Sequence, residues 1–223
     1  MRSGSAAAVA VVAAALLLLA PAPGSAQAPG QGRLFLTGGL QVVDVAELNQ
    51  RLRARGLPTF SEERLALGLG VDRRVGPWLL GAEGALLPAE ESSAGGLRRS
   101  LGARYGVLQA GYLLPLVSGL RVYPLAGVGL GSVELTTSGD EAVTFEDVLE
   151  GPVPGSEVGT GGLMLQGGLG VDLAVGGVTV GVRGGYTFAP GAAEWSRRGE
   201  TVEDAPDVGL EGAFLRAVLA IVD

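Results

Sequence analysis

The sequence contains no histidine, no cysteine and no lysine. Without cysteine there is no disulfide framework, no thiolate nucleophile and no lipid-bearing N-terminal cysteine. Without histidine, the usual general base of a serine nucleophile is missing. No paired-carboxylate motif stands out in its place, and the glycines at 127, 129 and 131 belong to a strand pattern rather than to a phosphate loop. We therefore expect no enzymatic activity, no cofactor and no metal site.

Basic charge and long apolar helices are also scarce. The 16 arginines face 23 acidic residues, for a formal net charge of -7, which argues against a nucleic-acid-binding face. The acidic residues gather in two segments, 140–157 and 194–207, without the spacing of a calcium-binding loop, so we favour solvated loops over a divalent-cation site. Beyond the first residues, no apolar run reaches the 18 or so residues of a spanning helix.

The N-terminal segment has the pattern of a secretory signal peptide. Arg2 precedes an apolar run from Ala6 to Ala20, and the small residues Gly24, Ser25 and Ala26 follow. The apolar run is too short to span a membrane. We expect cleavage after Ala26, which divides the chain into a signal peptide (1–26) and one folded domain (33–223).

Aliphatic residues alternate with small or polar residues along most of the remaining chain. Leu34, Leu36 and Leu40 share one side of an extended segment, and Thr37 and Gln41 share the other. Eight strands are expected on this basis, at about 33–44, 64–72, 78–86, 100–114, 120–135, 163–172, 178–183 and 209–222. In the fourth and fifth, Gln109 and Glu134 fall on the apolar side unless a bulge shifts the phase.

The connections between these strands alternate between long and short. Long ones are expected at about 45–63, 87–99, 136–162 and 184–208. The first contains a short helix, in which Asp44 and Glu47 have capping-box spacing and Leu48 and Leu52 form a stripe. Its arginines indicate either contact with anionic headgroups or, as we favour, a helix that caps the end of the fold. The pattern predicts an all-β, antiparallel up-and-down β-barrel of about eight strands.

The apolar faces are nearly continuous leucine and valine, whereas the opposite faces carry small residues and a few charges. This distribution fits a transmembrane barrel with lipid outside better than a soluble barrel with an apolar interior. Charges inside a narrow barrel must be paired. We therefore expect a structural ion network in the lumen, with a gated ion path as the alternative. Its predicted members are Arg64, Asp72, Glu83, Arg104, Asp172, Arg183 and Arg216.

In these features the chain resembles small bacterial outer-membrane β-barrels of the OmpA and OmpX kind, in the porin family. The resemblance implies an outer-membrane location with both termini in the periplasm, contact with outer-membrane lipid and lipopolysaccharide, and a monomer whose long loops face outside partners. It also implies a non-enzymatic structural or surface-interaction role. A small ion-conducting pore and a soluble periplasmic lipid-binding barrel stay open as alternatives. One departure is the final Asp223, where such barrels usually end on an aromatic residue.

Part of the sequence is repeated at an offset of 100 residues. The segment from Gly68 to Asp72 recurs as Gly168 to Asp172, and both copies are followed by a tight turn. Two explanations stay open: duplication of a half-barrel, or coincidence between glycine-rich hairpins.

Overall fold

The computed structural model of the chain describes residues 32–117, 119–139, 155–175, 177–190, 195–197, 200–202 and 204–222. The predicted signal peptide, the acidic residues between 140 and 150 and the final Asp223 lie outside these ranges, so those inferences stay predictions. Within the described residues, no helix is long and apolar enough to cross a membrane.

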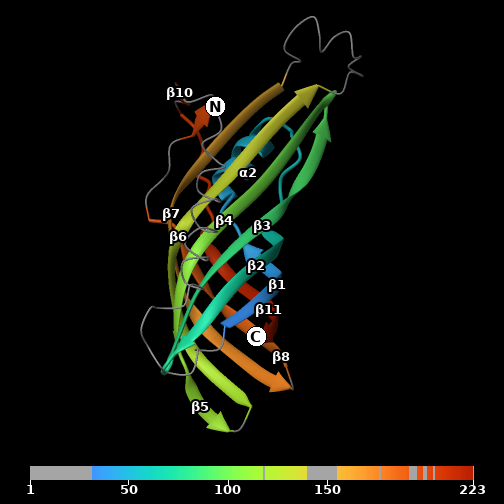
Figure 1. Cartoon of the computed structure of the whole chain (residues 1–223). Helices are drawn as coiled ribbons and strands as arrows, with labels where there is room; N and C mark the ends of the chain where they lie inside the picture. The colour runs from blue at the N-terminus through green and yellow to red at the C-terminus, as the bar shows by residue number, and fades with distance from the viewer. Residues whose placement is uncertain are drawn as a thin grey trace, which may run out of the picture.

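Eight long antiparallel strands close into a barrel (Figure 1). Each pairs with its neighbour along the chain, β6 pairs with β7, and β11 pairs with β1 to complete the ring. Closure leaves no free edge around the ring of strands. The strands are β1 (Gly32–Val42), β2 (Glu63–Val75), β3 (Trp78–Ala94), β4 (Leu97–Tyr112), β6 (Leu120–Gly139), β7 (Gly155–Val175), β8 (Val178–Phe188) and β11 (Gly212–Val222). The expected fold class is confirmed.

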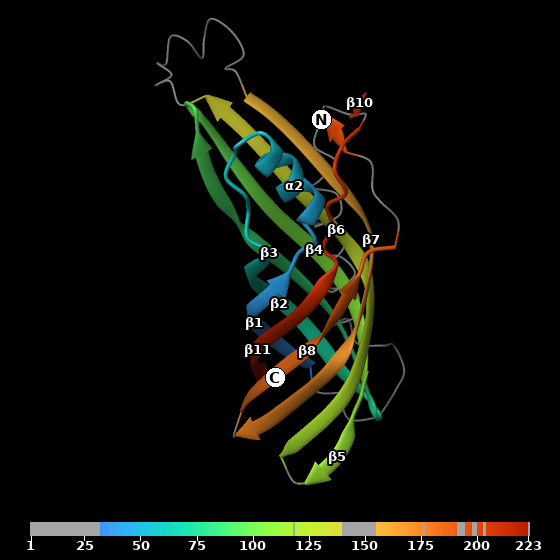
Figure 2. The ribbon, with the colours of Figure 1, turned by 180° about the vertical axis from the view of Figure 1, so that it is seen from behind.

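The remaining elements are short: α2 (Ala46–Ala54) follows β1, β5 (Leu114–Val117) extends the connection between β4 and β6, and β9 (Ser196–Arg197) and β10 (Glu200–Thr201) lie between β8 and β11. We call the end of the barrel with the β2–β3 and β7–β8 turns the turn end. The opposite end, which carries α2, is the loop end (Figure 2).

The prediction of a long connection between the third and fourth strands is wrong. Strands β3 and β4 continue to Ala94 and Leu97, and only Gly95 and Gly96 separate them. Both glycines have positive φ, 61° and 72°, which other residues rarely adopt. As a result β3, β4, β6 and β7 extend beyond the other four strands at the loop end (Figure 1).

The alternation predicted from the sequence sets the two faces of most strands. Leu34, Leu36 and Leu40 point outward from β1, while Thr37 and Gln41 point into the barrel. The leucines of β2, β7 and β11 and the valines of β8 also point outward, whereas Val218 of β11 points inward. Leucine and valine therefore cover the outside of the barrel, and many remain about half exposed.

Strand β4 differs because it carries apolar residues on both faces. Tyr105 and Val107 point inward and are buried, whereas Leu108 and Tyr112 point outward. Its ladder with β6 runs without a register shift, so no bulge occurs there. Gln109 consequently lines the interior and is half-buried.

A bulge is found in β3 instead. Leu87 pairs with Ala103 and Glu90 pairs with Leu101, so two residues of β3 face one residue of β4. The extra residue reverses the phase of β3. Beyond the bulge, Glu90 lies on the face that continues the interior.

Candidate functional site

The barrel interior has a charged layer toward the turn end and an apolar layer toward the loop end. Six of the seven residues predicted for the lumen are buried in the interior, with side chains no more than 6% exposed. Five of them belong to one ion network: Asp72, Glu83, Asp172, Arg183 and Arg216. Arg64 lies inside but apart from this network, and Arg104 lies on the outer face.

Arg33 is a network member that the sequence analysis did not select. Its Nε and Nη2 donate to the two oxygens of Asp72 at 2.7 and 2.8 Å, and its Nη1 donates to Asp172 Oδ2 at 2.7 Å. One guanidinium thereby joins two strands that are far apart in the sequence. The sequence does point to Arg33. It lies four residues before the inward-facing Thr37 in the same strand, and residues an even number apart share one face.

The network continues from Asp72 toward the middle of the barrel. Arg183 Nη2 lies 3.2 Å from Asp72 Oδ2, and its Nη1 lies 3.7 Å from Glu83 Oε2. Glu83 Oε1 is 3.2 Å from Arg216 Nη1, and Arg216 Nη2 donates to Gln41 Oε1 at 2.8 Å. Three guanidinium groups thus meet three carboxylates. This balance of sign is what burial of charge requires.

Aromatic rings lie beside the guanidinium groups of Arg183 and Arg216. The guanidinium of Arg183 lies 4.5 Å from the ring centroid of Phe35 and 5.9 Å from that of Tyr123. Arg216 lies 4.3 Å from Phe214 and 5.1 Å from Tyr105. Desolvated contacts of this kind are favourable and exclude water from the ion pairs.

Glycine makes room for these rings. Phe35 pairs with Gly70 in the β1–β2 ladder, and Tyr123 pairs with Gly170 in the β6–β7 ladder. A Cβ added to either glycine would overlap the ring opposite. The hydroxyl of Tyr123 reaches the network, donating to Asp172 Oδ1 at 2.9 Å and accepting from Arg183 Nε at 3.1 Å.

Arg64 of β2 contacts the neighbouring strands β3 and β4, and Glu90 links this group to the first loop. Its Nη2 donates to the carbonyl oxygens of Pro88 and Leu101 at 2.6 and 2.9 Å, and its Nε lies 3.6 Å from Glu90 Oε2. The same carboxylate accepts the backbone N–H of Ser61 at 3.1 Å. The bulge in β3 is what turns Glu90 inward to make these contacts.

Arg104 does not line the lumen. It lies on the outer face of β4, where its side chain is half-exposed, donates to Ser132 Oγ at 3.3 Å and pairs with Glu134. The physical reason is the phase of β4: the ladder that buries Tyr105 and Val107 turns every even-numbered residue of this strand outward.

Above the network, apolar side chains fill the lumen at the loop end. Leu48 and Leu52 of α2 are buried together with inward-facing residues of the strands, such as Leu101 and Val133, and with Trp195 of the last loop. Asn49 fixes the helix to its own return segment, because its amide exchanges hydrogen bonds of 2.8 and 2.9 Å with the backbone of Phe60. Helix α2 therefore caps the barrel.

A polar clasp joins α2 to the last loop. Glu47 does not form the predicted capping box. Its Oε1 accepts from Arg51, and its Oε2 accepts the backbone N–H of Asp207 at 2.6 Å. Arg51 also donates to the carbonyl oxygen of Asp204 at 2.5 Å. The hydrogen bond from Asp207 and those from Arg51 hold the pKa of Glu47 below its usual range.

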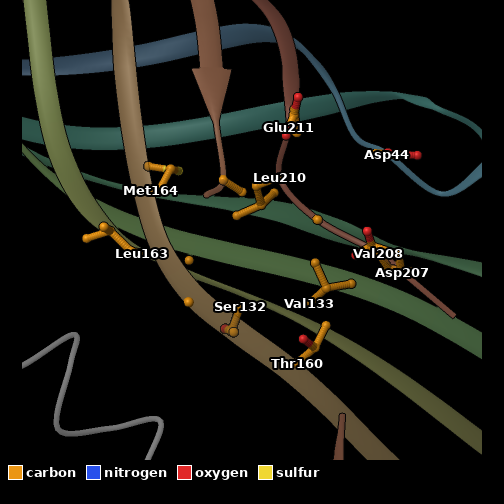
Figure 3. A pocket seen from close by; sticks show the side chains of 15 residues that line it. Asp44, Ser132, Val133, Thr160, Leu163, Met164, Asp207, Val208, Leu210 and Glu211 are labelled. Atoms are coloured by element: carbon orange, nitrogen blue, oxygen red, sulfur yellow. The ribbon is translucent and has the colours of Figure 1, made fainter. Parts of the chain in front are cut away.

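A small cavity of about 70 Å³ lies at the loop end, between β6, β7 and the segment 207–211. Figure 3 shows Met164 of β7 and Leu210 of the last loop among the side chains that line it. Pockets for drug-sized ligands usually measure roughly 300 Å³ or more, so this cavity is much smaller than a typical ligand pocket. The described residues contain no group of three acidic side chains placed to hold a metal ion.

No protein-family model matches the sequence, and no curated protein matches it. Several solved structures have a fold similar to that of this chain. A major outer membrane protein from Thermus thermophilus has a TM-score of 0.52 at 12% identity, covering 86% of this chain and 99% of that one. Neisserial surface protein A scores 0.47 at 13% identity, covering 86% and 96%. Ail of Yersinia pestis scores 0.47 at 12% identity, covering 87% and 99%. At such low identity these likenesses concern the fold alone.

Proposed function

We propose that this chain, which has the fold of a small outer-membrane β-barrel, is a closed, non-enzymatic barrel that spans a bacterial outer membrane. Its loop end would face partners outside the cell, and its termini would lie in the periplasm. The observation that carries the proposal is the inside-out distribution of side chains: leucine and valine cover the outside, and the charged residues of the network are buried inside.

The apolar outer surface supports a lipid environment. Leu36, Leu169 and Ile221 are 57%, 59% and 64% exposed, and comparable residues surround the barrel. Soluble monomers rarely expose apolar patches larger than a few hundred Å². Aromatic residues occur near both ends of this surface, as in the girdles of membrane barrels. At the turn end, Trp78 and Tyr112 pack edge to face with their ring centroids 5.2 Å apart.

The packed interior supports a closed barrel over an ion-conducting one. Ion pairs occupy its charged layer, and the apolar cluster with α2 fills the layer above. A soluble lipid carrier would need the reverse arrangement, an apolar lumen within a polar exterior. The proposed role is therefore structural or surface-interacting. Arg53 and Arg55 are exposed on α2 and the residue that ends it, where anionic lipopolysaccharide headgroups are a suitable contact.

Conductance across planar bilayers tests the closed lumen. The purified wild-type protein should produce no steady channels. Steady channels whose conductance changes in Arg183→Glu, but not in the outward-facing control Arg104→Glu, would contradict a closed barrel and establish the pore.

Cysteine labelling on whole cells tests location and orientation, since the natural chain has no cysteine. A cysteine introduced at Glu157 should react with a membrane-impermeant maleimide, and one at Gly177 should react only after lysis. The opposite pattern would invert the topology. Recovery of the mature protein from the periplasm without detergent would contradict the membrane assignment.

A further inference from the structure

The two segments that echo each other in sequence also have the same strand register. In the β2–β3 hairpin Asp72 pairs with Gly81, and in the β7–β8 hairpin Asp172 pairs with Gly181. The last pair of each ladder is also equivalent: Val75 pairs with Trp78, and Val175 pairs with Val178. The offset of 100 residues therefore holds for all nine pairs of the β2–β3 ladder, including positions where the residues differ.

The equivalence extends to the strand before each hairpin. In the strand register, Arg33 of β1 lies opposite Asp72, and Arg121 of β6 lies opposite Asp172. Two residues further along, an aromatic residue faces a glycine in both cases: Phe35 faces Gly70, and Tyr123 faces Gly170. The equivalent residues of β1 and β6 are 88 residues apart. A comparison of the sequence with itself at an offset of 100 residues therefore does not detect this match.

The strand after each hairpin also carries an aromatic residue, which faces a small residue of the hairpin. Tyr105 of β4 pairs with Ala85 of β3, and Phe214 of β11 pairs with Gly185 of β8. Positions 85 and 185 are equivalent by the offset of 100. The two aromatic rings therefore occupy equivalent places, and both lie beside the guanidinium of Arg216.

We propose that the barrel consists of two equivalent four-stranded units, each of which is the docking partner of the other. Unit 1 comprises β1, β2, β3 and β4, and unit 2 comprises β6, β7, β8 and β11. The shared positions, above all the pairs of an aromatic residue with a glycine, determine the shape of each unit. The positions that differ determine which unit pairs with which.

Buried charge supplies the complementarity between the units. Within the network, unit 1 contributes Arg33, Asp72 and Glu83, and unit 2 contributes Asp172, Arg183 and Arg216. The network charge is therefore -1 in unit 1 and +1 in unit 2. Four of its five ion pairs cross between the units, and only the pair of Arg33 with Asp72 lies within one. Pairing a unit with its own copy would bury uncompensated charge, which is costly.

The two ladders that join the units, β4–β6 and β11–β1, are here called the seams. Their registers are not equivalent. Val107 and Arg216 are equivalent in β4 and β11, yet Val107 pairs with Gly129 whereas Arg216 pairs with Gly39. By the offset of 88, the residue equivalent to Gly129 is Gln41, so the seams differ by two residues. An even shift keeps inward residues inward. Inside the units, the register is the same wherever both ladders extend, up to the bulge in β3, whereas the register between the units is shifted.

An exchange of charge between equivalent positions tests the proposal in the full chain. The exchange variant carries Glu83→Arg, Val107→Arg, Arg183→Glu and Arg216→Val, which moves the charge pattern of each unit to the other. The control carries only Glu83→Arg and Arg183→Glu, which has the same net charge but places the arginine introduced at position 83 beside Arg216. Refolding into detergent micelles and the urea midpoint of unfolding measure the result. We expect the exchange variant to unfold at a higher urea concentration than the control. A midpoint equal to or below that of the control overturns the proposal.

A milder exchange decides the matter if both variants fail to refold. Tyr123→Phe removes the hydroxyl bonded to Asp172, and we expect it to lower the urea midpoint. Because Phe35 is the equivalent residue, the double variant with Phe35→Tyr and Tyr123→Phe places the hydroxyl beside Asp72 and should recover most of the loss. A double variant no more stable than Tyr123→Phe shows that the two sites are not equivalent and overturns the proposal.

Discussion

Replacement of Arg33 by methionine tests the buried network most directly. Arg33 makes three charged hydrogen bonds of 2.7 to 2.8 Å, two to Asp72 and one to Asp172, and its side chain is 4% exposed. Methionine has a similar length and no charge. The substitution leaves Asp172 with the hydroxyl of Tyr123 and no arginine, while Asp72 keeps Arg183 at 3.2 Å.

Removal of one partner from a buried ion pair costs about 3–5 kcal/mol, because the other charge stays buried without compensation. We take about 4 kcal/mol for Arg33→Met, since one of its two carboxylates keeps a second arginine. With a urea dependence of about 2 kcal/mol per molar, the midpoint of unfolding should fall by about 2 M.

Urea titration in detergent micelles, followed by tryptophan fluorescence, measures this shift. Arg104→Met is the matched control, because it removes the same group from a half-exposed pair on the outer face. Such pairs contribute at most about 1 kcal/mol. The second variant, Arg33→Met with Asp172→Asn, restores the balance of charge and should recover about 1–3 kcal/mol. If Arg33→Met shifts the midpoint no more than Arg104→Met does, the network does not hold the barrel together.

Two further predictions concern the packing of the rings and the clasp at the loop end. Gly70→Ala should cost about 1–3 kcal/mol of unfolding free energy, because its Cβ overlaps the ring of Phe35, whereas Gly167→Ala, with open space around it, should change the urea midpoint little. Glu47 should stabilise the clasp above its usual pKa of about 4.5 and lose that effect as the pH falls through its lowered folded pKa. Hydrogen exchange at the Asp207 amide should therefore lose protection on acidification in the wild type, relative to the Glu47→Gln variant; parallel pH profiles in the two proteins would contradict this role.

Much of the barrel was predictable because alternation is a local property of an extended chain. A period of two residues fixes the faces of β1, β2, β7, β8 and β11 wherever one face is clearly apolar and the other is small or polar. The network residues of β2, β3, β7, β8 and β11 were identified on this basis. Arg33 was accessible to the same reasoning, since it shares the parity of Thr37, but it lies at the very start of its strand.

The orientation of β4 and the length of the β3–β4 hairpin were not predictable in this way. Tyr105 and Leu108 lie on opposite faces of β4 and are both apolar, so the local pattern does not say which side faces the lumen. The ladders with β3 and β6 decide it, and Arg104 is turned outward as a result. The bulge at 88–89 is equally invisible locally, because it depends on how β3 fits against β4.

The sequence by itself determined the strand pattern, the apolar outer surface and the residue types available for a charged interior. Only the tertiary structure decided which of those charges meet. Arg33 and Asp172 are 139 residues apart, and no local signal links them. Closure of β1 onto β11 and of β6 onto β7 brings them together, because each ladder fixes the height of its residues in the barrel and all the ladders must agree before the ring can close.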